Sequence, residues 1–66
     1  MTIFLNGERR SVASARTIAQ LVGELNLIPE TLLIEHNGRA LRRDEWNAGA
    51  ITDGDKIEFI RVVAGG

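Results

Sequence analysis

Residues 17–25, with the sequence TIAQLVGEL, predict the helix around which the rest of the fold is organised. Ile18 begins an apolar series that continues at positions 21, 22 and 25, the spacing of one face of an amphipathic helix. Thr17, with Gln20 three residues later, matches a capping box at the start of the helix. Asn26 favours a left-handed end to the helix, and a proline follows at position 29, where a helix cannot continue.

Before this helix, the sequence predicts a β-hairpin. Residues 2–6 and 9–13 contain β-forming residues, and Asn6-Gly7 lies between them. Asn-Gly is the dipeptide that a type I′ turn prefers, because both of its central positions need a positive φ. A second Asn-Gly pair, at residues 37–38, predicts a second hairpin after the helix.

The predicted order of elements is two strands, one helix and three more strands. The strands after the helix are residues 32–36, 39–41 and 56–63, with one helical turn at RRDEW and a turn at residues 52–55. One helix covers one face of a mixed sheet, which is the architecture of an α+β roll of the β-grasp, ubiquitin-like kind. We expect the first and last strands to lie parallel in its centre.

Length and composition limit the function classes. A chain of 66 residues holds one small domain, which we place at residues 1–63 with a flexible Ala-Gly-Gly tail at residues 64–66. The net charge of −1 gives no reason to expect nucleic acid or an anionic membrane. No apolar run is long enough to span a bilayer, no segment resembles a signal peptide, and cysteine is absent. We therefore expect a cytoplasmic protein.

Alternation along the strands assigns side chains to the two faces of the sheet. The side chains expected to face the helix are those of Ile3, Leu5, Leu32, Ile34, Ile57 and Phe59. Phe4, Leu33 and Ile60 then share the uncovered face, with Val62 further along the last strand. An apolar cluster on an uncovered face predicts a partner-binding site, although a small sheet also exposes some apolar atoms without any partner.

Residues able to support metal binding or catalysis are sparse. His36 is the only histidine, and we expect it to be a partly exposed residue at a strand end, with no metal bound. Residues 53–55, Asp-Gly-Asp, lack the further ligands of a calcium loop and are explained by a turn. Ser11 and Ser14 belong to no recognisable triad. The domain is therefore not expected to be an enzyme.

Two further groups have two interpretations each. Arg39, Arg42 and Arg43 lie close together in the sequence and either bind an acidic partner surface or form a solvated face. Trp46, the sole tryptophan, either folds back on the edge of the core and anchors its loop or serves as an aromatic anchor in an interface.

The sequence ends with RVVAGG, so two glycines follow the last predicted strand. Gly65 and Gly66 lack side chains and can thread a narrow channel where a Cβ would clash. The carboxylate of Gly66 is a poor electrophile, so a partner enzyme would have to activate it before it could react.

Taken with their order and spacing, several short stretches make this chain resemble the ThiS family, the sulfur carrier proteins of thiamine biosynthesis. These stretches are NGE at 6–8, TIAQLVGEL at 17–25, NG at 37–38, RDEW at 43–46, DGDKIE at 53–58 and AGG at 64–66. ThiS-like sequences usually have a Pro-Arg-x-x-Trp stretch. Here Arg42 replaces the proline, while Arg43 and Trp46 remain, which puts only the rigidity of this loop in doubt.

The resemblance implies a cycle of chemistry on Gly66. A ThiF-type adenylyltransferase uses ATP to form an acyl-adenylate on the terminal carboxylate, and sulfur then arrives from a persulfide donor. The product is a thiocarboxylate, from which the thiazole synthase ThiG takes sulfur. The carrier itself binds no cofactor. Gly65 and Gly66 would be the reactive end, and Phe4, Leu33, Ile60 and Val62 the partner-binding residues.

Three alternatives remain at this point. A MoaD-like subunit uses the same chemistry for molybdopterin synthesis. A ubiquitin-like modifier would be joined through Gly66 to lysines of target proteins. A plain β-grasp interaction module would be indifferent to changes at Gly66.

Overall fold

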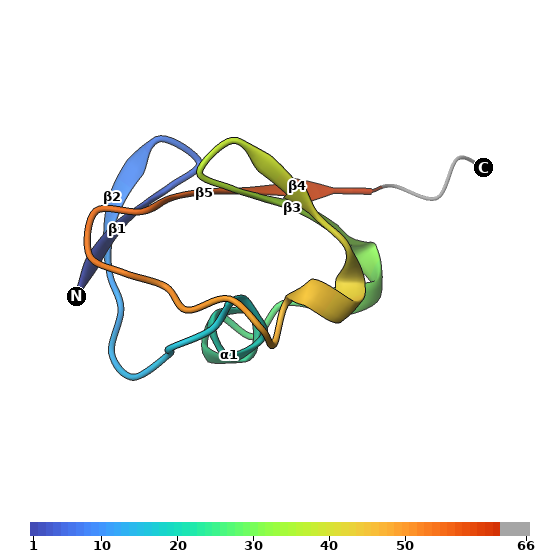
Figure 1. The fold of residues 1–66 in the computed structure, drawn as a ribbon, viewed down its shortest axis with the longest axis horizontal. Helices are drawn as coiled ribbons and strands as arrows, with labels where there is room; N and C mark the ends of the chain where they lie inside the picture. The colour runs from blue at the N-terminus through green and yellow to red at the C-terminus, as the bar shows by residue number, and fades with distance from the viewer. Residues whose placement is uncertain (63–66) are drawn as a thin grey trace.

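Within the part of the chain that the structure describes, the sheet has five strands in the order β2-β1-β5-β3-β4, with α1 packed against one face (Figure 1). The computed structural model describes residues 1–62. The bounds are β1 Thr2–Leu5, β2 Glu8–Ser11, α1 Ile18–Glu24, β3 Leu32–His36, β4 Arg39–Leu41 and β5 Lys56–Arg61, with short 3-10 turns η1 Pro29–Thr31 and η2 Arg43–Glu45.

The central pair of strands confirms the predicted β-grasp architecture. β1 and β5 run parallel, whereas the β1–β2, β3–β4 and β3–β5 pairs are antiparallel. The last strand ends at Arg61, earlier than the predicted end at residue 63. The proposed domain boundary at 63 and the tail at 64–66 lie outside the described residues.

Both Asn-Gly pairs form the turns that the sequence predicts. The φ angles are 52° and 82° at Asn6 and Gly7, and 51° and 84° at Asn37 and Gly38. A positive φ at both central positions matches a type I′ turn, whose twist suits a two-residue hairpin. The first turn follows Leu5 directly, so β1 is one residue shorter than predicted and β2 begins one residue earlier.

The ends of α1 follow the predicted signals, with one difference in hydrogen bonding. Thr17 Oγ1 accepts the N–H of Gln20 at 3.2 Å, as a capping residue does. The Gln20 side chain accepts the N–H of Arg16, at 2.7 Å, instead of that of Thr17 as a capping box would require. The helix ends at Glu24, and Asn26 has a φ of 57°, the left-handed conformation expected after it.

Glu24 fastens the loop that precedes the helix. Its carboxylate accepts the backbone N–H groups of Ser14, Ala13 and Ala15 at 3.0–3.1 Å. The hydrogen bonds from Ser14 and Ala13 lower the pKa of Glu24. A loop without strand or helix structure is thereby fixed against α1.

The core lies between the sheet and α1 and includes the predicted inward-facing side chains. Its buried members are Ile3, Val12, Ala15, Ile18, Leu21, Val22, Leu32, Ile34, Trp46, Ile51 and Ile57, with Leu5 and Phe59 packed against them. Trp46 is 2% exposed and anchors its loop in the core, so its interpretation as an exposed interface anchor is wrong. The guanidinium of Arg43 lies 4.4 Å from the centroid of the Trp46 ring.

Two asparagines attach β5 to the hairpins on either side of it. Asn6 donates its N–H to the Ile57 carbonyl at 2.9 Å, and its Oδ1 accepts the N–H of Phe59 at 2.8 Å. Asn37 donates its N–H to the Lys56 carbonyl at 2.7 Å, and its Oδ1 accepts the N–H of the same residue at 2.8 Å. These hydrogen bonds place both turns at fixed positions along the central strand.

Asp55, directly before β5, is a buried carboxylate that joins three segments. It accepts hydrogen bonds from the backbone N–H and hydroxyl of Thr52, both at 2.9 Å, and from Asn37 Nδ2 at 3.2 Å. His36 Nε2 lies 2.7 Å from Asp55 Oδ2 and donates to it, because an ionised carboxylate can only accept. The turn at residues 53–55 is as predicted, but the pairing of His36 was not.

The pKa of Asp55 reflects two opposing influences. Burial alone would raise it, whereas the hydrogen bonds from Thr52, His36 and Asn37 favour the ionised form. The hydrogen bonds dominate and hold the pKa well below its usual range.

Replacing Asp55 by alanine should lower the free energy of unfolding by about 2–4 kcal/mol, because the N–H of Thr52 and the ring of His36 lose their acceptor. Asp44→Ala is the control, since Asp44 is 76% exposed and should change stability by less than about 0.5 kcal/mol. Urea denaturation measures both, and equal effects would contradict the role of Asp55.

The same carboxylate predicts a pH dependence. The pKa of Asp55 is lower in the folded protein than its unfolded value of about 3.9, so its contribution to stability is complete above about pH 4. That contribution is lost as the pH falls toward the folded-state pKa. The difference in unfolding free energy between the parent and Asp55→Asn should therefore narrow in acid.

Candidate functional site

Figure 1 shows that α1 lies on one side of the sheet. An apolar patch lies on the opposite, uncovered face. Leu33 of β3 and Ile60 of β5 are cross-strand partners and are 57% and 47% exposed. Val62, two residues after Ile60, is also 47% exposed. These three residues, called the outer patch below, have the exposure that the alternation of the strands predicts.

Phe4 does not belong to this patch, so the predicted cluster of Phe4, Leu33 and Ile60 is wrong in its extent. In the parallel β1–β5 pair, Phe4 is in register with Lys56. Lys56 precedes Ile60 by four residues, which corresponds to about 13 Å along the strand. Phe4 is only half-buried, and it lies further toward the start of β5 than the outer patch does.

Charged residues occupy the positions between Phe4 and the outer patch. Glu35 and Glu58 are cross-strand partners, one step along the same face from the pair of Leu33 and Ile60. Like charges directly opposite each other destabilise a sheet. The outer face therefore places a row of exposed apolar side chains beside two carboxylates, an arrangement that folding alone does not favour.

The three arginines of β4 and of the turn that follows it are engaged within their own segment. Arg39 pairs with Glu45 at 3.0 Å, Arg42 with Asp44 at 3.2 Å, and Arg43 stacks on the tryptophan. The first two arginine side chains are 66% and 76% exposed, which favours the interpretation as a solvated face.

Arg42 occupies the position where ThiS-like sequences usually have proline. Its φ of −74° is one that proline can adopt. Its backbone N–H donates to Glu45 Oε1 at 2.7 Å, a hydrogen bond that proline could not make. The hydrogen bond from Arg42 lowers the pKa of Glu45. A capping hydrogen bond thus holds the turn in place of the rigid ring.

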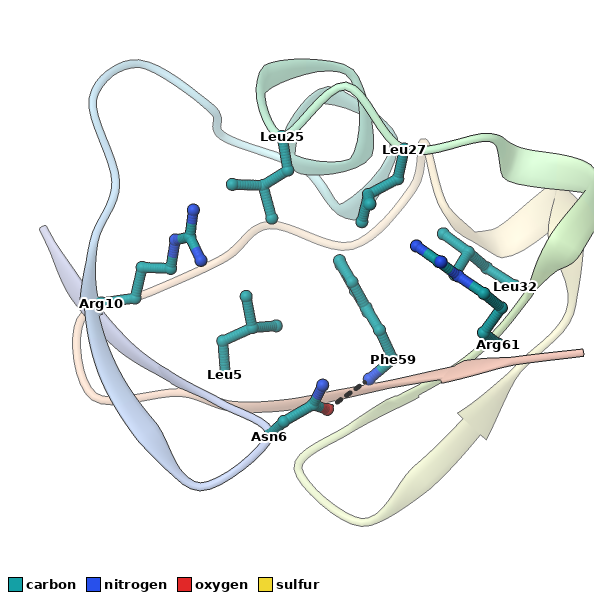
Figure 2. A pocket seen from close by; sticks show the side chains of 8 residues that line it. All are labelled: Leu5, Asn6, Arg10, Leu25, Leu27, Leu32, Phe59 and Arg61. Carbon is teal, nitrogen blue, oxygen red and sulfur yellow. Dashed lines mark hydrogen bonds between the residues drawn. The ribbon is translucent and has the colours of Figure 1, made fainter.

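A cleft of about 350 Å³ lies on the other side of the sheet, near the C-terminal end of α1, and the sequence patterns did not predict it. Its lining residues are Leu5, Asn6, Arg10, Leu25, Leu27, Leu32, Phe59 and Arg61. Figure 2 shows Leu5 and Phe59 pointing from the sheet toward Leu25 and Leu27, with Arg10 and Arg61 at opposite sides. Its lining contains no acidic residue.

Residues 1–62 give no support for a metal site or for a membrane-spanning helix. Within that range no cluster of histidine and carboxylate side chains is arranged to hold a metal ion. The helices in the same range are too short or too polar to cross a bilayer. Gly65 and Gly66, the predicted reactive end, lie outside the described residues.

A comparison with family models matches residues 3–66 to one described as the ThiS family. The chain belongs to the ThiS family. The crystal structure of the thiamine biosynthesis protein ThiS from Geobacter metallireducens superimposes with a TM-score of 0.85 and 30% identity, over the whole of both chains. The sulfur carrier protein ThiS of Escherichia coli K12 is 27% identical over 66 residues, which is the whole of both sequences.

Two further relatives are much longer than this chain. The thiazole synthases of Paramagnetospirillum magneticum and Magnetococcus marinus are each 30% identical to it over 66 residues. The chain spans about a fifth of the length of these relatives, 20% in both cases. A ThiS-like segment and a longer sequence named for thiazole synthesis therefore share one polypeptide.

Substitutions on β5 should distinguish the two faces of the sheet. Ile57 is 0% exposed, so Ile57→Ser should lower the free energy of unfolding by about 3–5 kcal/mol through a cavity and a buried hydroxyl. Ile60→Ser, on the same strand, should lower it by less than about 1 kcal/mol. Thermal and urea denaturation provide the measurement, and a large loss at Ile60 would show that the outer patch is structural.

Proposed function

We propose that this chain is a sulfur carrier of thiamine thiazole biosynthesis, with Gly66 as the residue that carries the sulfur. The observation that carries the proposal is the family match over residues 3–66, supported by the full-length similarity to ThiS proteins. In the proposed cycle, a partner enzyme uses ATP to adenylate the carboxylate of Gly66. The terminal sulfur of a persulfide then displaces AMP and gives an acyl disulfide on Gly66. A thiol reductant cleaves the S–S bond of this intermediate, which leaves the thiocarboxylate on Gly66 and a disulfide between the donor and the thiol.

The composition of the chain agrees with this chemistry. The 66 residues contain no cysteine, so sulfur cannot be carried on a thiol of this sequence. A carboxylate needs activation before a sulfur nucleophile can replace its oxygen, and we assign that step to the partner, so the carrier is a co-substrate and not an enzyme. The cycle would run in the cytoplasm, where ATP is available.

The proposed partners differ in their support. The relatives named thiazole synthase contain a segment similar to this chain, which favours a ThiG-type enzyme as the acceptor of the sulfur. A ThiF-type adenylyltransferase and a persulfide donor follow from the chemistry of the cycle. The names of the relatives favour the thiamine pathway over a MoaD-like role or a ubiquitin-like modifier.

The outer patch is the proposed docking surface for the adenylating enzyme. It lies at the C-terminal end of β5, so a partner bound there would be next to the residues that follow Val62. Exposed apolar side chains gain free energy when a partner removes them from water. Phe4 would belong to the same interface only if the partner extended about 13 Å further along the sheet.

Deleting Gly66 should abolish adenylation while leaving the fold unchanged. The deletion withdraws the terminal carboxylate by about 3.3–3.6 Å, and a misplacement near 1 Å already costs about a hundredfold in rate. The variant Gly65→Val should also not be adenylated, because the branched side chain of valine would obstruct the narrow channel that we propose in the partner enzyme. ATP–pyrophosphate exchange with a ThiF-type enzyme measures activation, and intact mass measures replacement of oxygen by sulfur. Normal exchange by the deletion variant would overturn the proposal.

Ile60→Glu should weaken binding to the adenylating enzyme about a hundredfold or more, because an unpaired carboxylate would be buried in an apolar interface. The matched control is Arg42→Glu, which places the same side chain on an exposed turn outside the outer patch. Circular dichroism checks that both variants are folded, and isothermal titration calorimetry measures Kd. Equal affinities for Ile60→Glu and the parent would show that the enzyme docks elsewhere.

A further inference from the structure

The cleft beside α1 has the composition of a recognition site. Five apolar side chains form most of its lining, and the guanidinium groups of Arg10 and Arg61 lie at its sides (Figure 2). A volume of about 350 Å³ falls in the range of ligand pockets. Arg61 and Leu27 also line an adjoining hollow with Ile28, which is 62% exposed.

The edge of the sheet next to this cleft offers unpaired backbone groups. β2 is the terminal strand in the sheet order, and its four residues are all exposed. Val12 donates its N–H to the Met1 carbonyl at 2.8 Å, so Met1 and Val12 form a hydrogen-bonded pair of the β1–β2 hairpin. Hydrogen-bonded and non-hydrogen-bonded pairs alternate along an antiparallel pair of strands. The N–H and C=O groups of Arg9 and Ser11 therefore point away from β1.

Charge distinguishes this edge from the opposite one. Among residues 1–62, Arg9, Arg10 and Arg61 have no ion pair within 4.0 Å. On the opposite edge strand β4, Arg39 is already paired with Glu45. The β2 edge thus has free backbone groups, two arginines without an ion pair beside one exposed carboxylate, that of Glu8, and an adjacent apolar cleft.

We propose that the β2 edge and this cleft bind an extended acidic segment of a partner protein. The segment would pair its backbone with the outward groups of Arg9 and Ser11, as strands added to sheet edges do. Alternate side chains of an added strand point to the same face, so its apolar residues would enter the cleft. Its acidic residues would lie beside Arg10 and Arg9. This surface is separate from the outer patch, and its occupation does not depend on sulfur transfer.

A capped peptide, Glu-Glu-Val-Glu-Leu-Glu-Glu, is a suitable probe. In an added strand its valine and leucine face the cleft, flanked on the same face by glutamates, while the remaining glutamates lie on the face of Arg9. Titration into the ¹⁵N-labelled 66-residue chain should shift the amides of β2 and of the cleft residues. Hydrogen exchange at the outward amides of Arg9 and Ser11 should slow, with little change at Arg10, which already faces β1.

Two matched comparisons test the components of the site. Arg10→Glu should raise the Kd of the peptide about fivefold, whereas Arg16→Glu, the same charge change at an exposed loop position, should raise it less than about twofold. A peptide with N-methyl groups on the amides facing β2 keeps its side chains but cannot pair, so it should not bind measurably.

Three results would overturn the proposal. One is equal binding of the N-methylated peptide, which would mean that only side chains are recognised. The second is an equal loss of affinity in Arg10→Glu and Arg16→Glu, which would mean general charge attraction. The third is a set of shifts confined to the outer patch, or none at saturating peptide.

Discussion

The side chains of Asn6 and Asn37 accept hydrogen bonds from the backbone of β5, one from each neighbouring hairpin turn. Because both asparagines have a positive φ, the turn conformation that closes each hairpin also directs its side chain at the central strand. Asp55 fixes the start of that strand through His36 and Thr52. The positions of the core, the outer patch and the end of β5 all follow from how this strand is held.

The sequence predicted the elements and their faces because those features are local. Turn chemistry at the Asn-Gly pairs and helical periodicity at residues 17–25 need no information from distant residues. Alternation placed Ile57 inside and Ile60 outside correctly. Alternation did not predict the neighbours of Phe4, because it assigns a side chain to a face of the sheet but does not give the register between strands. In the parallel pair, the offset between β1 and β5 decides which residues are neighbours, and it puts Phe4 beside Lys56.

Other features were missed because they assemble from several segments. The partners of Asp55 lie 3, 18 and 19 residues away in the sequence, so no short motif contains them. The cleft depends on where α1 ends relative to the sheet, and its lining comes from β1, β2, β5 and the chain around α1 and β3. The reactive glycines were predicted from sequence and family resemblance alone, and their assignment remains a proposal.

The outer face has features that lower the stability of the domain and that the fold does not require. Leu33 and Ile60 expose large apolar side chains, and the adjacent Glu35 and Glu58 place like charges opposite each other. A domain of 66 residues has a small core, so such losses weigh heavily on its stability. The buried face offsets them through closely packed residues on both sides of the core, from Ile3 and Ile57 in the sheet to Leu21 in α1. Because β5 contributes alternate side chains to each face, the strand that completes the core also presents Ile60 to a partner, and the two roles can be altered separately by substitutions only a few residues apart.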